Sequence, residues 1–149
     1  MKKILFAVII TLFIPLFLNA QANKIEGLWF NEEKTSKLDV KKGSDGLISG
    51  KIVWLDEPME DGAPKLDKEN PDEALAKKPL MGLVIVKNFS YDSKKDRWID
   101  GSIYDPKNGK TYDCYAWFED DDFSNLYIKG YVAGIKALGR KTIWTKTSL

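Results

Sequence analysis

The chain of 149 residues contains no histidine and only one cysteine. Without histidine, the sequence excludes Ser-His-Asp and Cys-His nucleophiles, imidazole metal ligands and any side chain that ordinarily titrates near neutral pH. One cysteine cannot form an internal disulfide, a thiolate zinc site or an iron–sulfur site. These absences exclude several large classes of enzyme, and the sequence predicts neither a cofactor nor a metal site.

A large net charge is also lacking. The formal charge is 23 − 22 = +1, and it becomes 21 − 22 = −1 when Lys2 and Lys3 are removed. Because the two signs are interspersed, the whole chain gives no electrostatic footprint for nucleic acid or for an anionic membrane. The sequence therefore predicts no nucleic-acid partner.

The first residues of the chain have the form of a secretory signal. Lys2 and Lys3 provide a positive start, residues 4–18 are almost entirely apolar, and Ala20 and Ala22 are the small residues of a cleavage site. As a helix, the apolar run would span about 22 Å, which is too short for a hydrocarbon core of roughly 30 Å. We expect cleavage after Ala22, with cleavage after Ala20 as the alternative.

This pattern divides the chain into two parts, a cleaved signal peptide of residues 1–22 and a single domain of residues 23–149. The domain carries no second long apolar run, so we expect no membrane span. The sequence predicts an exported protein, periplasmic or secreted, that is soluble after cleavage.

Eight segments of the domain alternate polar and apolar residues with period two and are rich in β-branched and aromatic side chains. These segments are residues 25–30, 37–42, 47–55, 82–89, 97–104, 110–119, 125–132 and 140–146. Most are joined by short turn-like connections, which favours an all-β fold. We predict an antiparallel meander barrel of about eight strands, with a two-sheet sandwich as the competing architecture.

Two connections resemble functional motifs but have a sufficient structural explanation. In residues 104–110, Asp105 is suited to accept a turn hydrogen bond, Pro106 fixes the second turn position and Gly109 fits a left-handed conformation. The acidic run at residues 119–122 lacks the alternating pattern of a calcium loop. We interpret both as hairpin turns.

Residues 56–80 form an unusually long connection that contains four of the six prolines. Inside it, Asn70 is a good helix N-cap, Pro71 suits the first helical position, and Glu73 completes a capping box. Pro79 would end the helix. The sequence predicts a flap or crossover with one short helix of about two turns.

Alternation also predicts which side chains face the barrel interior. The inward set is Tyr112, Cys114, Ala116, Phe118, Leu126, Ile128, Gly130, Val132, Ile52, Trp54, Thr142 and Trp144. Cys114 is interpreted as a buried, inert thiol. The strand at residues 97–104 leaves two choices: either Asp100 is a buried carboxylate that needs a partner, or it faces solvent. The apolar Ile99 and Ile103 on the opposite face favour the second choice.

The first and last strands carry a weak signature. The run Gly27-Leu28-Trp29 opens the first strand, and basic residues flank Trp144 in the last. This arrangement resembles that of the lipocalin (calycin) superfamily, in which such a tryptophan packs beneath a basic side chain from the end of the barrel. The resemblance implies a cation–π contact with Trp29 from either Arg140 or Lys146.

A second resemblance extends over nearly the whole domain. Its motifs are Gly27-x-Trp29, Gly50-Lys51-Ile52-Val53-Trp54-Leu55, Asn70-Pro71-Asp72, Pro79-Leu80-x-Gly82-Leu83, Gly101-x-Ile103-Tyr104-Asp105-Pro106-x-x-Gly109-Lys110-x-Tyr112, Gly130-Tyr131, Gly139-Arg140 and Trp144. The chain resembles the small exported bacterial proteins of domain of unknown function 2147. This resemblance implies export and a lipocalin-like barrel, with no established activity and no catalytic residues. Asp100 stands where a glycine is common, and Lys129 and Lys146 where arginine is expected.

Three functions remain open. The first is a non-catalytic barrel that binds a small apolar or amphipathic ligand. The second is an envelope module with a filled core, which contacts a protein through outward aromatic residues; these are Tyr115, Trp117, Tyr127 and Tyr131. The third, which we favour least, is a histidine-independent enzyme that uses aspartate and tyrosine side chains. The candidate ligand-binding residues are Trp54, Asn70, Asp72, Asp100, Tyr104, Tyr112, Phe118 and Trp144.

Overall fold

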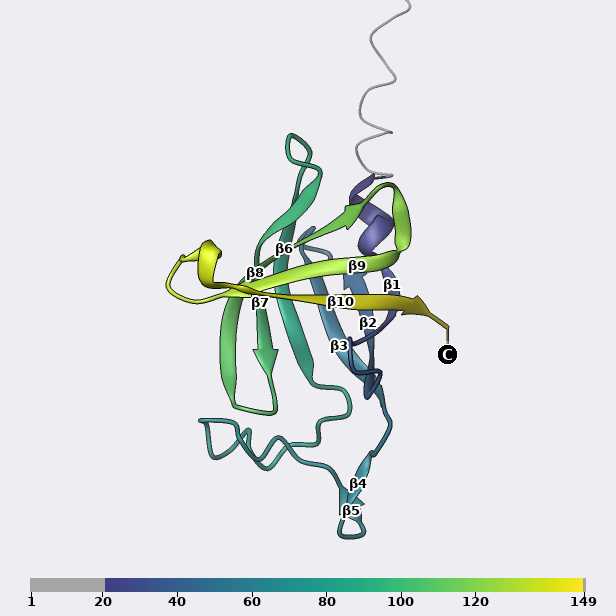
Figure 1. Cartoon of the computed structure of the whole chain (residues 1–149). Helices are drawn as coiled ribbons and strands as arrows, with labels where there is room; N and C mark the ends of the chain where they lie inside the picture. Colours follow the sequence, from purple (N-terminus) through teal and green to yellow (C-terminus); the bar gives the residue numbers. More distant parts are fainter. Residues whose placement is uncertain (1–20, 149) are drawn as a thin grey trace, which may run out of the picture.

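The computed structural model describes residues 21–148, which form a closed antiparallel barrel of eight strands (Figure 1). The barrel strands are β1 (Gly27–Phe30), β2 (Ser36–Lys42), β3 (Ile48–Leu55), β6 (Val84–Asp92), β7 (Arg97–Asp105), β8 (Lys110–Glu119), β9 (Asp122–Tyr131) and β10 (Arg140–Thr147). Their order around the barrel is β1-β10-β9-β8-β7-β6-β3-β2. The predicted barrel is confirmed, and the competing sandwich is wrong because the sheet closes on itself. The predicted signal segment lies outside the described residues, except for Gln21 and Ala22.

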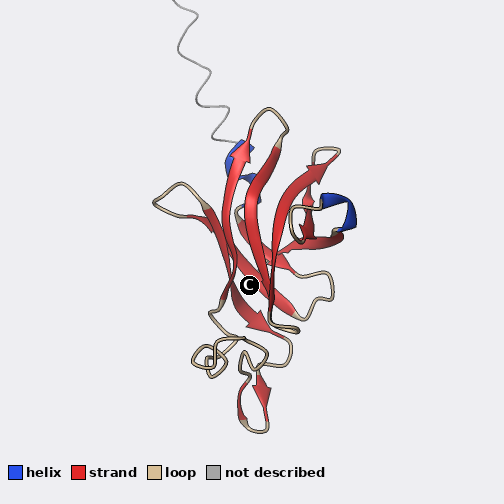
Figure 2. Ribbon diagram, turned by 90° about the vertical axis from the view of Figure 1, so that its left-hand side faces the viewer, coloured by secondary structure: helices blue, strands red, loops and turns tan. Residues whose placement is uncertain are grey.

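The two ends of the barrel differ in how they are covered. At one end, called here the η1 end, the short helix η1 (Asn23–Ile25) lies across the barrel (Figures 1 and 2). Since consecutive strands are antiparallel, the connections at residues 31–35, 56–83, 106–109 and 132–139 gather at the opposite end. We call this the loop end. One of these connections, residues 132–139, contains the short helix η2 (Lys136–Leu138).

The interior of the barrel is apolar and closely packed. Trp29, Leu38, Cys114 and Ala116 are completely buried. Every buried side-chain nitrogen and oxygen among the described residues has a hydrogen-bond partner. Burial raises the pKa of the Cys114 thiol to about 12, so the thiol stays protonated and unreactive at neutral pH. The prediction that Cys114 is buried is confirmed.

A β-bulge in β7 explains why simple alternation could not orient that strand. Trp98 pairs with Ala116, yet the next inward pair is Gly101 with Cys114, so the strand contains one extra residue. Asp100 lies in this bulge with a φ of 58° and is exposed. The left-handed conformation is one that glycine adopts without steric cost. The choice that placed Asp100 in solvent is confirmed, although Ile99 does not face inward as the alternation implied.

A second irregularity, in β3, reverses the predicted orientation of Trp54. The register between β2 and β3 shifts, because Leu38 pairs with Ile52 whereas Lys37 pairs with Trp54. Leu38 and Ile52 are buried, so Lys37 and Trp54 share the outer face. There Trp54 meets Phe30 edge to face at 5.8 Å between ring centroids. The prediction that Trp54 faces inward is wrong.

The helix expected at residues 70–79 is replaced by turns. The side-chain oxygen of Asn70 accepts the predicted cap-type hydrogen bond from the amide of Asp72 at 3.0 Å, and the side-chain oxygen of Asp72 accepts two more from the amides of Ala74 and Leu75. A single helical hydrogen bond follows, from the amide of Ala76 to the carbonyl of Asp72 at 2.8 Å. Too few residues then remain before Pro79 for a cooperative helix.

The same connection contains a small hairpin that the sequence analysis missed. Its strands are β4 (Met59–Glu60) and β5 (Ala63–Pro64), which project below the barrel in Figure 1. The turn residues Asp61 and Gly62 both have positive φ, as the tight Asp-Gly hairpin turn requires. Asp-Gly is a strong signal for a turn, but here no alternating apolar residues flank it. None of the helices in residues 21–148 has the length and apolar character that crossing a membrane requires.

Candidate ligand-binding site

The half of the barrel near the η1 end is filled by tryptophan side chains. Trp29, Trp98 and Trp144 are each at most 3% exposed. The indole of Trp29 donates a hydrogen bond to the carbonyl of Ile25 at 2.9 Å, and that of Trp98 donates to the carbonyl of Ala22 at 3.1 Å. Both acceptors belong to the segment that covers this end. The η1 half is therefore a solid core that residues 22–25 help to close.

The cation–π contact implied by the lipocalin resemblance lies in this half. The ammonium of Lys146 sits over the Trp29 ring, 5.2 Å from its centroid. Of the two expected partners it is Lys146 that makes the contact. Arg140 lies at the loop end instead, 3.6 Å from Glu32.

Near the loop end, the inward-facing side chains are less covered. Ile103 pairs with Tyr112 and Thr142 pairs with Ile128, which places Ile103, Tyr112 and Thr142 on the inner face. All three are only partly buried, as is Gly130. A Cβ atom at Gly130 would meet the nearest side chains of Tyr112 and Ile103 at 3.6 and 3.9 Å, which is ordinary contact. The inner face is thus less covered at the loop end, and a Cβ atom would fit at Gly130 without a clash.

A buried carboxylate fastens the long connection to the outside of β7. Asp67 is 1% exposed and accepts a hydrogen bond from the hydroxyl of Tyr104 and another from the side-chain amide of Asn70, each at 2.7 Å. Burial, with a contribution from the Asp67 carboxylate, raises the pKa of Tyr104 to about 12. Together these three side chains hold residues 56–83 against the barrel. Asp67 was missed because nothing in its sequence context sets it apart from other acidic residues.

A second polar network lies on the connection at residues 106–109. The side-chain amide of Asn108 donates hydrogen bonds to the Asp105 carboxylate and to the hydroxyl of Tyr112, each at 3.0 Å. Asp105 also accepts from the backbone of Lys107 at 2.9 Å, and Gly109 has a φ of 68°. The predicted hairpin turn is confirmed, and it fixes the hydroxyl of Tyr112 at the entrance to the inner face.

The connection at residues 31–35 reaches across the loop end. Glu33 pairs with Lys107, and this contact lowers the pKa of the Glu33 carboxyl. Beside it, Glu32 accepts a hydrogen bond from the hydroxyl of Thr142 at 3.2 Å. The β1–β2 and β7–β8 connections lie on opposite sides of the barrel in the strand order, so the contact between Glu33 and Lys107 spans the loop end.

Comparison with known proteins identifies the chain. The family model described as an uncharacterized protein conserved in bacteria, DUF2147, matches residues 27–146. The chain belongs to the DUF2147 family. Curated proteins give no match. The solved structure of protein HP1028 from the human pathogen Helicobacter pylori, assigned to the lipocalin family, is similar with a TM-score of 0.70 and 18% identity. The alignment covers 83% of each chain and establishes a lipocalin-like fold.

Within this DUF2147 barrel, the eight predicted site residues do not form one site. Asn70 and Tyr104 meet at Asp67 on the outer side of the loop end, and Tyr112 lies at the entrance of the inner face. Phe118 and Trp144 face inward but belong to the filled half, where Phe118 lies 6.0 Å from Trp29.

The other three predicted site residues lie outside the barrel. Trp54 contacts Phe30 on the outer face, Asp72 is an exposed turn cap, and Asp100 is exposed on the β7 bulge. Asp100, the first carboxylate named by the enzyme hypothesis, is therefore not enclosed in a cleft. Among the described residues, no group of three or more acidic or cysteine side chains is arranged to hold a metal ion.

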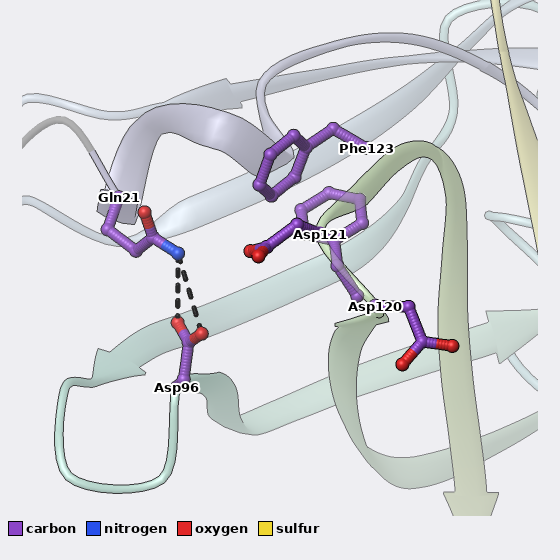
Figure 3. Close-up of a pocket in the computed structure, with 6 residues that line it drawn as sticks. Gln21, Asp96, Asp120, Asp121 and Phe123 are labelled. Carbon is purple, nitrogen blue, oxygen red and sulfur yellow. Dashed lines mark hydrogen bonds between the residues drawn. The ribbon is translucent and has the colours of Figure 1, made fainter.

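Two hollows flank the segment that covers the η1 end. One, of about 240 Å³, is lined by Gln21, Asp96, Asp120, Asp121, Phe118 and Phe123 (Figure 3). The side chain of Gln21 reaches Asp96 there at 3.3 Å. The other, of about 300 Å³, is lined by Ala22, Lys42, Gly46, Ile48, Tyr91, Ser93 and Trp98. Apart from Phe118, neither includes a predicted site residue.

Proposed function

We propose that this DUF2147 protein is a lipocalin-like binding protein that takes a small apolar or amphipathic ligand at the loop end of its barrel. The observation that carries the proposal is the contrast between the two halves of the interior. Tryptophans fill the η1 half, whereas Ile103, Tyr112, Gly130 and Thr142 at the loop end are only partly buried. Such a shallow site suits a ligand with one apolar portion and one polar end.

The polar end of this ligand would meet the groups fixed at the entrance. The hydroxyl of Tyr112 is oriented by Asn108, and the hydroxyl of Thr142 by Glu32. Both hydroxyls are able to donate and accept hydrogen bonds. The apolar portion would lie against Ile103 in the space beside Gly130.

The proposal is tested by a substitution that fills the space beside Gly130. In Gly130→Leu, we expect binding of the apolar fluorophore N-phenyl-naphthylamine to weaken by about tenfold or more, because the added carbons occupy the proposed site. Gly130→Ala is the matched control, since its Cβ makes only ordinary contacts, and it should bind as the unchanged protein does. Circular dichroism verifies that both variants fold.

The proposal fails if the unchanged protein binds no fluorophore saturably and native mass spectrometry finds no co-purifying small molecule. That outcome would favour a second function, an envelope module that contacts a protein partner through its outer face. Outward rings of β8 and β9 support this alternative, because Trp117 lies 5.3 Å from Tyr115 and 5.6 Å from Tyr127 between centroids. The tryptophan-filled half of the core supports it as well.

We also propose that the protein is exported, either to the periplasm or out of the cell. The support is the charged start, the apolar run and the small residues of positions 1–22. Cell fractionation tests the location, and the intact mass of the protein tests the cleavage. A protein found in the cytoplasm with residues 1–22 still attached would contradict the proposal.

A further inference from the structure

The β9–β10 connection carries three of the seven large apolar residues that are exposed in the described part of the chain. Val132, Ile135 and Leu138 are 54%, 50% and 78% exposed. Val132 was predicted to face inward, but β9 ends at Tyr131 and leaves it in the connection. Three apolar side chains grouped on one projecting loop form a patch, and exposed patches of this kind mark interaction sites. The loop projects from the side of the barrel in Figure 1.

The loop is well defined by hydrogen bonds. The amide of Ile135 donates to the carbonyl of Val132 at 3.0 Å, and the amide of Leu138 donates to the carbonyl of Ile135 at 3.2 Å. Lys136 packs back onto the barrel, 5.7 Å from the ring centroids of both Tyr115 and Tyr131. The apolar side chains are therefore presented by a fixed turn, and binding need not first order a flexible segment.

Basic residues border the loop. Within it or at the adjoining ends of β9 and β10 lie Lys129, Lys136, Arg140 and Lys141. Acidic side chains also approach from neighbouring elements: Glu32, which lies 3.6 Å from Arg140, and Glu33, Asp100 and Asp113. Lys136, Arg140 and Lys141 nevertheless border the apolar side chains of the loop directly.

We propose that the connection at residues 132–139 docks this protein onto an anionic phospholipid bilayer. Exposed apolar side chains bordered by lysine and arginine match the boundary between acyl chains and anionic headgroups. Tyr131 at the base of the loop suits the same boundary. Docking at a bilayer deepens the proposed binding function, on which it rests, by making a membrane lipid or another membrane-dissolved amphiphile the ligand class.

The experiment is co-sedimentation of the protein, residues 21–149, with vesicles of phosphatidylcholine alone or mixed with phosphatidylglycerol. We expect binding to the anionic vesicles, weakened by salt and much reduced on phosphatidylcholine alone. The double variant Ile135→Ser/Leu138→Ser should lose binding by about tenfold or more, because both side chains would insert into the bilayer. Lys136→Gln/Arg140→Gln should weaken binding to the anionic vesicles only.

The matched control is Met59→Ser/Leu75→Ser. These side chains are 53% and 48% exposed in the connection at residues 56–83, and the control should bind vesicles as the unchanged protein does. All variants change exposed residues, so circular dichroism should be unaltered. The proposal is overturned if the unchanged protein does not sediment with anionic vesicles, or if the loop variant sediments equally well.

Fluorophore binding measured without vesicles distinguishes a failure of membrane docking from a failure of ligand binding. The apolar loop variant Ile135→Ser/Leu138→Ser should bind N-phenyl-naphthylamine normally in solution, since Ile135 and Leu138 belong to the exposed connection and not to the inner face of the barrel. Normal fluorophore binding without vesicle binding contradicts only the docking. Vesicle binding without fluorophore binding contradicts the proposed ligand function and leaves the docking supported.

Discussion

At the scale of single residues, the most informative contacts are those of the buried side chain of Asp67. Asp67 is buried, no cationic side chain among residues 21–148 pairs with it, and its carboxylate accepts hydrogen bonds from the hydroxyl of Tyr104 and the side-chain amide of Asn70. A buried carboxylate is costly when a donor is removed. The contact therefore holds the long connection in place, and each of its donors should matter for stability.

Tyr104→Phe removes one of these donors. We expect the free energy of unfolding, measured in urea, to fall by about 1–3 kcal/mol, because a buried carboxylate oxygen loses its hydrogen bond. The matched control is Tyr115→Phe, whose hydroxyl makes no hydrogen bond among the described residues, and it should change stability by less than about 0.5 kcal/mol. Equal effects of the two substitutions would contradict this account of Asp67.

The same tyrosine predicts a dependence on alkaline pH. Its pKa is raised from 10.0 to about 12, so the folded state favours the protonated hydroxyl. The stabilisation is fully present below pH 10 and is lost as the pH rises through 12. Tyr104→Phe should lack this part of the alkaline decline when unfolding is measured between pH 9 and 12, and an unchanged decline would count against it.

At the scale of elements, irregularities of the strands decide which residues face inward. The bulge in β7 reverses the alternation at Asp100, and the shift between β2 and β3 moves Trp54 to the outer face. Period-two patterning therefore placed regular strands such as β8 correctly, where Cys114 and Ala116 are completely buried. It could not locate an extra residue, because a bulge is defined by its pairing with the neighbouring strand.

Substitution at the bulge tests this interpretation. Asp100→Gly should raise the free energy of unfolding by up to about 1 kcal/mol or leave it unchanged, because glycine adopts the positive φ without strain. Asp100→Val should lower it by about 1–2 kcal/mol, since a β-branched residue is strongly disfavoured in that conformation. Thermal unfolding of both variants measures the difference, and a valine variant as stable as the glycine variant would be the contrary result.

The sequence could predict the barrel and its strands, but only part of the site. The strand bounds agree with the structure to within three residues at each end, because amphipathic alternation is a local property. The contacts at the loop end join residues far apart in the chain, such as Asp67 with Tyr104 and Glu33 with Lys107. No local pattern specifies such partners. The predicted helix also failed at a local level, because Asn70 and Asp72 both accept cap-type hydrogen bonds and too few residues then remain before Pro79.

At the scale of the whole molecule, the segment at the η1 end belongs to the folded barrel. The carbonyl of Ala22 accepts the hydrogen bond of the Trp98 indole, although Ala22 lies inside the predicted signal segment. A protein that begins at Gln21 should therefore be more stable than one that begins at Asn23 by about 1–3 kcal/mol, because the shorter chain leaves a buried donor unpaired. Urea unfolding of the two purified chains measures this, and equal midpoints would contradict it.

The pairing of the first barrel strand with the last has a consequence for how the protein forms. Leu28 pairs with Thr147, so the barrel closes through contacts between the two ends of the domain. Closure must wait until the last residues have been delivered, and high contact order makes such folding slow. A chain cut before β10 would leave β1 and β9 with free edges, which invite pairing between molecules. Premature termination should therefore produce aggregates, while the complete chain has no barrel edge left to share.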